Sequence, residues 1–359
     1  MAPIAYRDAF VARLFDDIAE LIASDKGDPA AIEARLHELA RSNSAAFAGY
    51  ARRAPLGLGV PDSAFKLDSP YYFADEPPTR TFRTSGTTGQ SRGTASYSLR
   101  GMQLMDASIL RQARSQIVRG VDRPVFVRLV PPEVLAPEMV MAHGMELIAR
   151  ELGHPELSAC VVGARGVDYE LLAARLDLAA SEGLPVVLIG GSFAFVNVCA
   201  ELETRRLRWS LPSGSRVVDA GGFKGRARGT DVEGLRALLR RTFGVPATAC
   251  LNLFGMTELA SQLYDAADQA LGPQGERPKG HTSFVWPQVR DAHDLELRAR
   301  GSGLLEVVDL CILDRPHRIL TGDRGIASEH GVAIAGRIER GQSRGCSLTL
   351  DAMTEGAHD

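Results

Sequence analysis

Several features that would place the chain in a special class are scarce or missing. The cysteines are widely scattered and odd in number, and no Cys-x-x-Cys pair occurs, which argues against a disulfide framework or a zinc site. The first residues, MAPIAYRDAFVARLF, lack the basic-then-apolar order of a signal peptide, and no apolar run approaches membrane-spanning length. We therefore expect a cytoplasmic protein without membrane insertion. The five cysteines are Cys160, Cys199, Cys250, Cys311 and Cys346.

A charge excess is also missing. The chain carries 41 basic and 44 acidic residues and a formal net charge of −3, so nothing indicates a nucleic-acid partner. Its apolar fraction of 45% and charged fraction of 24% are ordinary for a globular protein. With 359 residues, the chain is long enough for a large core and two or three lobes.

The apolar pattern of the chain indicates an α/β fold. Helical spacing runs from residue 6 to residue 50, with a boundary at Asp28-Pro29. Apolar strand candidates then alternate with amphipathic helices, which predicts a largely parallel sheet covered on both faces. After residue 295 we expect shorter strands and a small β-rich subdomain. The strands are expected at 125–130, 158–163, 185–191, 216–222 and 247–255, and the helices at 101–119, 137–152, 168–182, 192–206 and 231–243.

Residues 83–94 read RTSGTTGQSRGT, a glycine- and hydroxyl-rich stretch between two β-prone segments. A Walker loop would continue with Gly-Lys-Ser/Thr into a helix, and this one does not. The amides and hydroxyls of such a strand–loop–strand can wrap an anion. A plain polar hairpin is the alternative, and the stretch alone does not decide between them.

Ligands of open parallel sheets sit at the carboxyl ends of the strands, and three of these ends carry glycines or charges. Gly190-Gly191 is interpreted as an ordinary turn. Lys224 and Glu258 both place charge where a buried sheet meets a crevice. Taken alone, Glu258 is better interpreted as an acidic residue at a helix N-terminus, where it would complement the helix dipole.

Four segments in a fixed order change this interpretation. They are TSGTTG at 84–89, FGMTE at 254–258, TGD at 321–323 and GRIE at 336–339. In these segments the chain resembles the adenylate-forming superfamily of acyl-CoA synthetases, adenylation domains and luciferases, over most of residues 80–345. The resemblance implies an adenylate-forming N-terminal-domain-like fold. It also implies ATP and Mg²⁺ as cofactors and a carboxylic acid that attacks the α-phosphate of ATP.

The resemblance also implies roles for individual residues. Thr257 would bind the α-phosphate and Glu258 would bind Mg²⁺, which prefers oxygen ligands. Asp323 would accept hydrogen bonds from the ribose, and Arg337 would support ribose or phosphate. Alone, Thr-Gly-Asp would be interpreted as a β-turn. The remaining nucleotide-binding set is Ser85, Gly86, Thr87, Thr88 and Gly89 around the β- and γ-phosphates, together with Gly222, Phe254 against adenine, and Gly255.

Two positions depart from the superfamily's pattern. Ser91-Arg92-Gly93 stands where Pro-Lys-Gly is usual, and Glu339 stands where aspartate is usual. A larger departure is that 23 residues follow Gly336, too few for the mobile C-terminal domain of most members. We therefore expect no separate domain of that kind in this chain.

The short tail narrows the resemblance, together with the segments Gly221-Gly222-Phe223-Lys224 and Arg344-Gly345-Cys346-Ser347. In these features the chain looks like the LuxE-type acyl-protein synthetases. In that family an activated acyl group moves to a cysteine near the C-terminus, which implies Cys346 as acyl carrier and Lys224 as a catalytic residue. Arg337, Arg340 and Arg344 would favour the thiolate of Cys346. The alternative is that Cys346 is a small buried hydrophobe, as we interpret the other four cysteines.

The resulting hypothesis is an acyl-protein synthetase that passes its acyl group to a partner reductase or a carrier protein. The alternatives are a ligase that uses coenzyme A or a carrier protein, and a non-catalytic nucleotide-binding subunit. His143 would line the acyl pocket or be a satisfied core histidine. The predicted parts are a helical layer and lead-in (1–79), an α/β core (80–294), a small β-rich subdomain (295–335) and a hinge-like tail with Cys346 (336–359).

Overall fold

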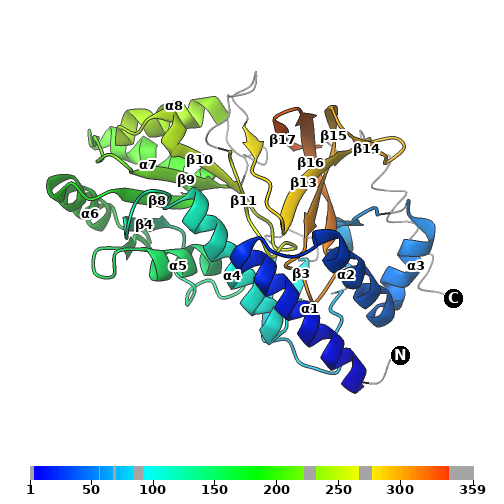
Figure 1. The fold of residues 1–359 in the computed structure, drawn as a ribbon. Helices are drawn as coiled ribbons and strands as arrows, with labels where there is room; N and C mark the ends of the chain where they lie inside the picture. Colours follow the sequence, from blue (N-terminus) through cyan, green and yellow to red (C-terminus); the bar gives the residue numbers. More distant parts are fainter. Residues whose placement is uncertain are drawn as a thin grey trace. The chain divides into compact units, whose positions relative to one another are not determined.

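The chain forms two compact units, each described separately. The computed structural model describes residues 4–55, 57–67, 70–84, 92–221, 232–266 and 277–338 (Figure 1). Unit 1 comprises Met1–Ser108, Met256–Ser261 and Pro278–Asp359, and unit 2 comprises Ile109–Gly255 and Gln262–Arg277. The four-part division made from the sequence stays a prediction.

Unit 2 is built on a largely parallel sheet, as the sequence predicts. Its strand order is β11-β10-β9-β8-β4-β5, and every pair is parallel except β10 with β11. β4 pairs with β5 on one side and β8 on the other, so the strand order reverses at this strand. The strands are β4 (Val125–Leu129), β5 (Ala159–Cys160), β8 (Val186–Gly191), β9 (Arg216–Ala220), β10 (Cys250–Phe254) and β11 (Leu263–Tyr264).

Helices cover both faces of this sheet. α6 (Tyr169–Glu182), α7 (Ser192–Thr204) and α8 (Val232–Phe243) share one apolar core with side chains of β4, β8 and β9. Figure 1 shows α5 (Val140–Leu152) on the opposite side of the sheet from α7 and α8. Burial of each large apolar side chain in this core stabilises the fold by about 1.5–3 kcal/mol. The remaining short elements of the unit are β6 (Val162–Gly163), β7 (Gly166–Val167) and η2 (Ala247–Ala249).

Polar residues at the helix ends explain several boundaries. Asp28 caps α2 (Pro29–Asn43) by accepting hydrogen bonds from the amides of Ala30 and Ala31 at 3.0 and 3.2 Å, which confirms the predicted boundary. Asp168 caps α6 through the amide of Leu171 at 2.9 Å. Gly183 ends the same helix with φ of 67°, a conformation that favours glycine.

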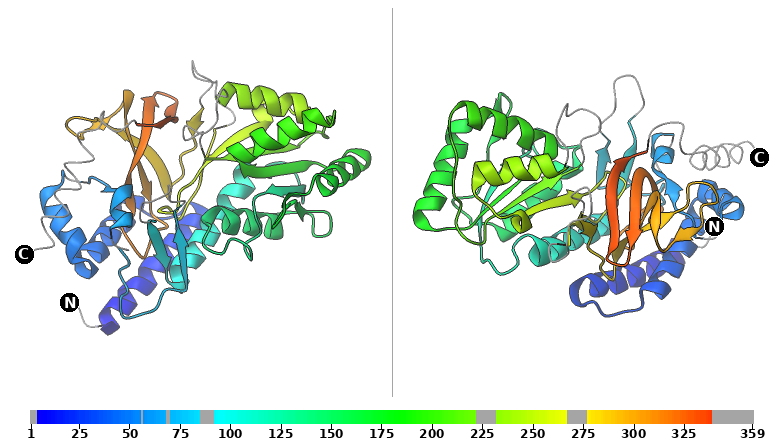
Figure 2. Two further views of the ribbon diagram at one scale, coloured as in Figure 1. Left: turned by 180° about the vertical axis from the view of Figure 1, so that it is seen from behind. Right: turned by 90° about the horizontal axis from the view of Figure 1, so that it is seen from above.

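Unit 1 contains an antiparallel sheet of order β12-β17-β16-β15-β13-β14, with β1 added in parallel on β16. The right-hand view of Figure 2 shows β15, β16 and β17 side by side, in orange to red. The β-rich character is as predicted, but the expectation of shorter strands is wrong, since β15 has 9 residues and β16 has 11. The strands are β1 (Val60–Pro61), β12 (Pro278–Lys279), β13 (Val285–Arg290), β14 (Leu297–Arg298), β15 (Gly301–Asp309), β16 (Arg318–Ser328) and β17 (Gly331–Arg337).

Unit 1 also contains the N-terminal helices and a hairpin. The helices are α1 (Ile4–Ser24), α2, α3 (Ala45–Arg53) and the 3₁₀ helix η1 (Asp62–Lys66). The hairpin joins β2 (Arg80–Arg83) and β3 (Thr94–Tyr97). α4 (Leu99–Gln116) begins in unit 1, and the boundary after Ser108 falls inside it. Among the described helices, none has the length and apolar character needed to cross a membrane.

Candidate functional site

The FGMTE motif straddles the end of a buried strand. Phe254 is the last residue of β10 in unit 2 and is half-buried there, and Gly255 follows the strand. Thr257 and Glu258 belong to unit 1 and are 8% and 5% exposed. The residues between β10 and β11 form turns and bends without a helix, so the alternative of a helix N-terminus for Glu258 is wrong.

Glu258 is a buried carboxylate without a neutralising partner in the described part of the chain. Burial raises its pKa to about 7, and the nearby charge of Asp62 adds to this effect. A hydrogen bond from its own backbone amide and the charges of Arg315 and Arg337 act in the opposite direction but do not outweigh burial. Such a group is costly to bury unless a cation or proton accompanies it.

The TGD motif lies inside a strand. Residues 321–323 belong to β16, so the alternative of an ordinary β-turn is wrong. The hydroxyl of Thr321 donates to the carbonyl of Leu305 at 3.0 Å and accepts from the amide of Asp323 at 3.1 Å. Asp323 is a register partner of Arg337 on β17, and Arg337 Nε lies 3.5 Å from Asp323 Oδ1. Two of the predicted site residues thus form an ion pair.

Asp62 joins these residues, although the sequence pattern did not single it out. Its Oδ2 lies 3.6 Å from Arg337 Nη2 and accepts from the amide of Gly322 at 3.4 Å. The parallel pairing of β1 with β16 places Asp62, because Pro61 is the register partner of Leu320. No local pattern around Asp62 reveals this pairing between segments 260 residues apart. The structure therefore gathers Asp62, Glu258, Asp323 and Arg337 within unit 1.

The flanks of the glycine loop form the predicted strand–loop–strand. β2 and β3 pair antiparallel, and the last pair joins Arg83 with Thr94. The amide of Thr84 donates to the carbonyl of Gly93 at 2.9 Å, and the amide of Gly93 donates to Thr84 Oγ1 at 2.9 Å. Residues 85–91 lie outside the described residues, so the phosphate-binding role of Ser85, Gly86, Thr87, Thr88 and Gly89 stays a prediction.

Four further expectations remain open. Gly222, Lys224 and Cys346 lie outside the described residues, and their roles stay predictions. His143 lies on α5 of unit 2, is 9% exposed, and has its Nδ1 3.2 Å from Glu133 Oε1. The imidazole therefore has a carboxylate partner, and its part in an acyl pocket also stays a prediction.

A polar network joins the carboxyl ends of three strands in unit 2. Ser192 Oγ donates to Asp219 Oδ2 at 2.7 Å, and Asn252 Nδ2 donates to the same oxygen at 2.8 Å. Asn252 also donates to the carbonyl of Gly221 at 3.1 Å. The network holds together the ends of β8, β9 and β10, which include the strand that leads into Phe254. The sequence pattern had indicated only an ordinary turn after β8.

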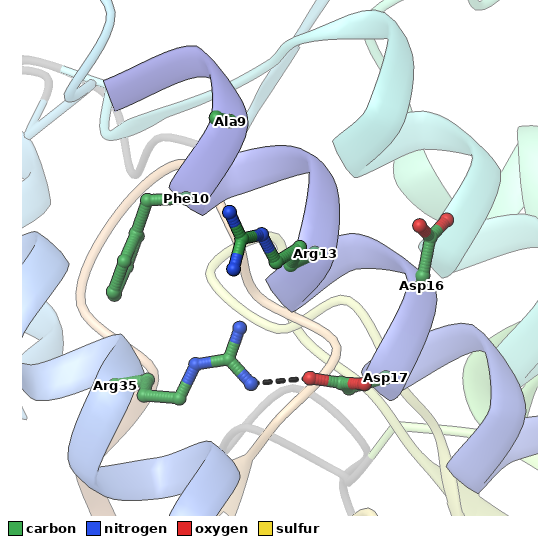
Figure 3. Close-up of a pocket in the computed structure, with 6 residues that line it drawn as sticks. All are labelled: Ala9, Phe10, Arg13, Asp16, Asp17 and Arg35. Carbon is green, nitrogen blue, oxygen red and sulfur yellow. Dashed lines mark hydrogen bonds and ion pairs between the residues drawn. The ribbon is translucent and has the colours of Figure 1, made fainter. Parts of the chain in front are cut away.

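A cavity of about 450 Å³ lies elsewhere in unit 1, between α1 and α2. Figure 3 shows Phe10, Arg13 and Arg35 around it, with Arg35 bonded to Asp17 and Asp16 directed away from that space. The guanidinium of Arg35 also lies 5.5 Å from the ring centroid of Phe10. None of the predicted site residues lines this cavity.

The described cysteines are free thiols, and most are buried. Burial raises the pKa of Cys199 and Cys250 to about 11 and that of Cys311 well above its ordinary value. Their interpretation as small buried hydrophobes is confirmed, whereas Cys160 is half-buried. Protonated, inaccessible thiols of this kind are poor nucleophiles.

Comparisons with known proteins identify solved structures with a similar fold. No protein-family model matches the chain, and no curated protein matches it. Among solved structures, an open conformation of 2-hydroxyisobutyryl-CoA ligase in complex with 2-HIB-AMP and CoA aligns with a TM-score of 0.57 at 13% identity, covering 87% of this chain and 71% of that one. The long-chain-fatty-acid-CoA ligase FadD1 from Archaeoglobus fulgidus aligns with a TM-score of 0.51 at 17% identity.

The fold is that of adenylate-forming enzymes. ATP-bound MatB from Rhodopseudomonas palustris agrees with this result, with a TM-score of 0.50 at 20% identity. The likeness covers 74% of this chain, which spans 52% of FadD1 and 50% of MatB, about half the length of each. At these identities the similarity establishes the adenylate-forming fold and leaves the reaction to be argued from the site.

The donor set fits a nucleotide-bound magnesium ion. Across the described ranges no cluster of three or more His, Cys, Asp or Glu side chains that could hold a metal is found. Mg²⁺ that accompanies a nucleotide takes one or two carboxylates and completes its shell with phosphate oxygens and water. Glu258 is a single buried carboxylate that forms no ion pair among the described residues, and it matches that requirement.

Proposed function

We propose that the chain uses ATP to activate a carboxylic acid as acyl-AMP and then transfers the acyl group to a protein thiol. The observation that carries this proposal is the position of Glu258, a buried unpaired carboxylate in the same unit as the Asp323–Arg337 pair. The adenylate-forming fold supports it, as does the order of the four sequence motifs.

In the first step a carboxylate oxygen of the acid attacks the α-phosphorus of ATP. The bond from that phosphorus to the bridging oxygen breaks, and pyrophosphate leaves with the electron pair. The reaction needs in-line positioning and stabilisation of the negative charge that develops on the phosphate oxygens. No proton transfer to the protein is required for this exchange.

Residues of unit 1 would supply the positioning. Asp323 would accept from the ribose hydroxyls, with Arg337 holding the carboxylate in place from the neighbouring strand. Thr257 would donate to the α-phosphate. Glu258 would hold Mg²⁺, which neutralises phosphate charge when it is bound. The 85–89 loop and Phe254 complete the proposed ATP site on the strength of the sequence motifs.

In the second step the thiolate of Cys346 would attack the acyl carbonyl of the adenylate. A thioester forms, the bond from the carbonyl carbon to the phosphate oxygen breaks, and AMP leaves. Lys224 would stabilise the negative charge on the oxygens, and Arg337, Arg340 and Arg344 near Cys346 in sequence would favour the thiolate. The acyl group would then pass to a reductase or carrier protein in the reducing cytoplasm.

A carboxylate ligase that uses a free thiol is the second candidate. It is favoured by the likeness of the fold to a ligase solved with an acyl-adenylate and CoA. In that reading the adenylation site is unchanged, and the acceptor is coenzyme A or a carrier-protein thiol in place of Cys346. A nucleotide-binding subunit without turnover is the third candidate.

One experiment separates the three candidates. The protein is incubated with ATP, Mg²⁺ and a panel of aliphatic and aryl carboxylates, and pyrophosphate release and intact protein mass are measured. The proposal predicts acid-dependent pyrophosphate and a hydroxylamine-labile mass gain that the Cys346→Ser variant lacks. Pyrophosphate that appears only with added coenzyme A supports the second candidate. ATP binding without pyrophosphate release supports the third.

A further inference from the structure

The segment that carries Thr257 and Glu258 has little structure of its own. Residues 255–262 form turns and bends between β10 and β11. A catalytic group on such a segment needs outside support, because a loop backbone otherwise samples several conformations. Three buried side chains from distant parts of unit 1 provide that support.

Arg315 is the most unusual of the three. It is 1% exposed, and it lies in the connection between β15 and β16. Its Nε and Nη2 donate to the backbone carbonyl of Glu258 at 3.3 and 3.1 Å. No hydrogen-bond partner is found for its Nη1 among the described residues. A fully buried guanidinium that binds a carbonyl in place of a carboxylate is a costly arrangement for stability alone.

Tyr97 supports the next residue of the segment. Its hydroxyl donates to the carbonyl of Leu259 at 2.9 Å and accepts from Arg315 Nη2. The guanidinium of Arg315 lies 4.0 Å from the ring centroid of Tyr97, so the two side chains also fix each other. Burial raises the pKa of Tyr97 to about 12, which keeps the hydroxyl protonated and able to donate.

Asp309 holds the far end of the segment. Its Oδ2 accepts from the amides of Ala260 and Ser261 at 2.9 and 2.7 Å, and its Oδ1 accepts from the hydroxyl of Ser261 at 2.8 Å. Backbone groups of four consecutive residues, 258 to 261, are therefore held by buried side chains. The support reaches the peptide of Glu258, whose carboxylate forms no ion pair with any residue that the structure describes.

We propose that Arg315, together with Tyr97, is a positioning residue that fixes the backbone of Glu258 so that its carboxylate faces the magnesium ion of bound ATP. This inference rests on the proposed function, because it assigns a purpose to the geometry around the proposed metal ligand. Arg315 acts through the carbonyl of Glu258 and does not itself touch the substrate. Loss of Arg315 should weaken the coupling between magnesium and ATP more than it weakens ATP binding itself.

The test measures ATP binding by calorimetry at a series of free magnesium concentrations. Arg315→Met should raise the magnesium concentration for half-maximal binding about tenfold or more, since it removes charged donors to one carbonyl. ATP affinity without magnesium should stay within about twofold. Arg315→Lys keeps a charged donor but lacks the planar guanidinium. Its magnesium requirement should lie between those of the wild type and Arg315→Met. Tyr97→Phe should raise the magnesium requirement by a smaller factor.

Arg277→Met is the matched control. Arg277 is also a buried arginine, 3% exposed, and it donates to the backbone carbonyls of Cys250 and Ala247 at 2.9 and 2.7 Å in unit 2. This variant should lower the melting temperature and leave the magnesium requirement unchanged. A purely structural role for Arg315 would give the same result as the control, and that outcome would overturn the proposal.

The outcomes keep this inference apart from the proposed function. If the wild-type protein shows no magnesium-dependent ATP binding, the proposed function fails before any variant is compared. If the wild type binds Mg–ATP and Arg315→Met behaves like it, only the positioning role fails. Should Arg315→Met not fold, unchanged magnesium dependence in both Arg315→Lys and Tyr97→Phe overturns the role.

Discussion

Glu258 is the residue at which function and stability are most clearly opposed. Its carboxylate is buried among few compensating groups, and its pKa is raised from 4.5 to about 7. Carboxylates in such surroundings are typical of sites where a ligand supplies the missing charge. The burial cost is present whether or not the ligand is bound, so it can be measured on the free protein.

The first prediction concerns the pH dependence of stability. Because the folded pKa lies above the unfolded one, the folded protein binds this proton more tightly. The contribution of this proton to the free energy of unfolding is complete below pH 4.5. It is lost as the pH rises to about 7, a change of about 3 kcal/mol. Urea unfolding at pH 5 and pH 8 should show this loss in the wild type and not in Glu258→Gln.

The exposed Glu329→Gln variant serves as the control, because its side chain is 66% exposed. It should follow the wild-type pH dependence. If the free energy of unfolding changed with pH in the same way in all three proteins, Glu258 would be solvated. That result would remove the argument for a buried metal ligand.

The second prediction concerns Asp323. Asp323→Ala removes the carboxylate proposed to accept from the ribose hydroxyls, so ATP affinity should fall by about 1.5–3 kcal/mol, roughly tenfold to a hundredfold. Asp28→Ala removes the cap of α2 and should lower the free energy of unfolding by about 1 kcal/mol without changing ATP affinity. ATP affinity is measured by calorimetry for the wild type and both variants. An Asp323→Ala affinity equal to that of the wild type would exclude Asp323 from the site.

At the scale of elements, the start of α4 shows how close packing overrides helix propensity. Replacing glycine by alanine inside a helix ordinarily stabilises a protein by up to about 1 kcal/mol. At Gly101, however, a Cβ atom would lie 1.7 Å from Oδ2 of the buried Asp314. At Gly49 in α3, the nearest atom would be Nη2 of Arg52 at 3.9 Å.

The third prediction follows from this pair of glycines. Gly49→Ala should raise the free energy of unfolding by up to about 1 kcal/mol. Gly101→Ala should lower it by about 1–3 kcal/mol, because Asp314 or the helix has to move. Denaturant unfolding gives both values, and a stabilising Gly101→Ala would show that Asp314 does not pack against α4.

The elements of unit 2 could be predicted from sequence because their signals are local. Apolar strands and amphipathic helices alternate, and glycine or aspartate marks their ends, as at Asp168 and Gly183 of α6. β16 was harder, because β1, one of the three strands that pair with its 11 residues, comes from a distant part of the chain. Taken alone, the TGD motif therefore favours a turn, although it lies in a strand.

The residues of the candidate site also differ in whether local sequence signals mark them. Glu258, Asp323 and Arg337 could be proposed from short motifs, and the structure brings them into one unit. Asp62 and Arg315 could not, because each reaches the site through pairing or packing with residues distant in sequence. Supporting residues carry no motif of their own, so only the structure reveals them.

At the scale of the whole molecule, the thiols distinguish an acyl carrier from structural cysteines. Cys199 and Cys250 in unit 2 and Cys311 in unit 1 are buried, with raised pKa values. The fourth prediction is that an alkylating reagent at pH 8 labels these three only after denaturation. A fast-labelling thiol should be present in the native wild type and missing in Cys346→Ser.

Cys160→Ser is the comparison for this labelling experiment, because Cys160 is half-buried and its Sγ donates to the carbonyl of Val130 at 3.2 Å. It should keep the fast phase. If the fast phase disappears in Cys160→Ser and persists in Cys346→Ser, the assignment of Cys346 as acyl carrier is wrong.

The central claim is that this protein adenylates a carboxylic acid, and exchange of labelled pyrophosphate into ATP measures that half-reaction without any acceptor. With Mg²⁺ and a panel of aliphatic and aryl acids, the wild type should show acid-dependent exchange. Cys346→Ser should exchange as well as the wild type, and Glu258→Gln should lose at least about 99% of the rate, since it removes the charge proposed to hold Mg²⁺. Exchange that is no faster in the wild type than in Glu258→Gln, with every acid, would contradict the account.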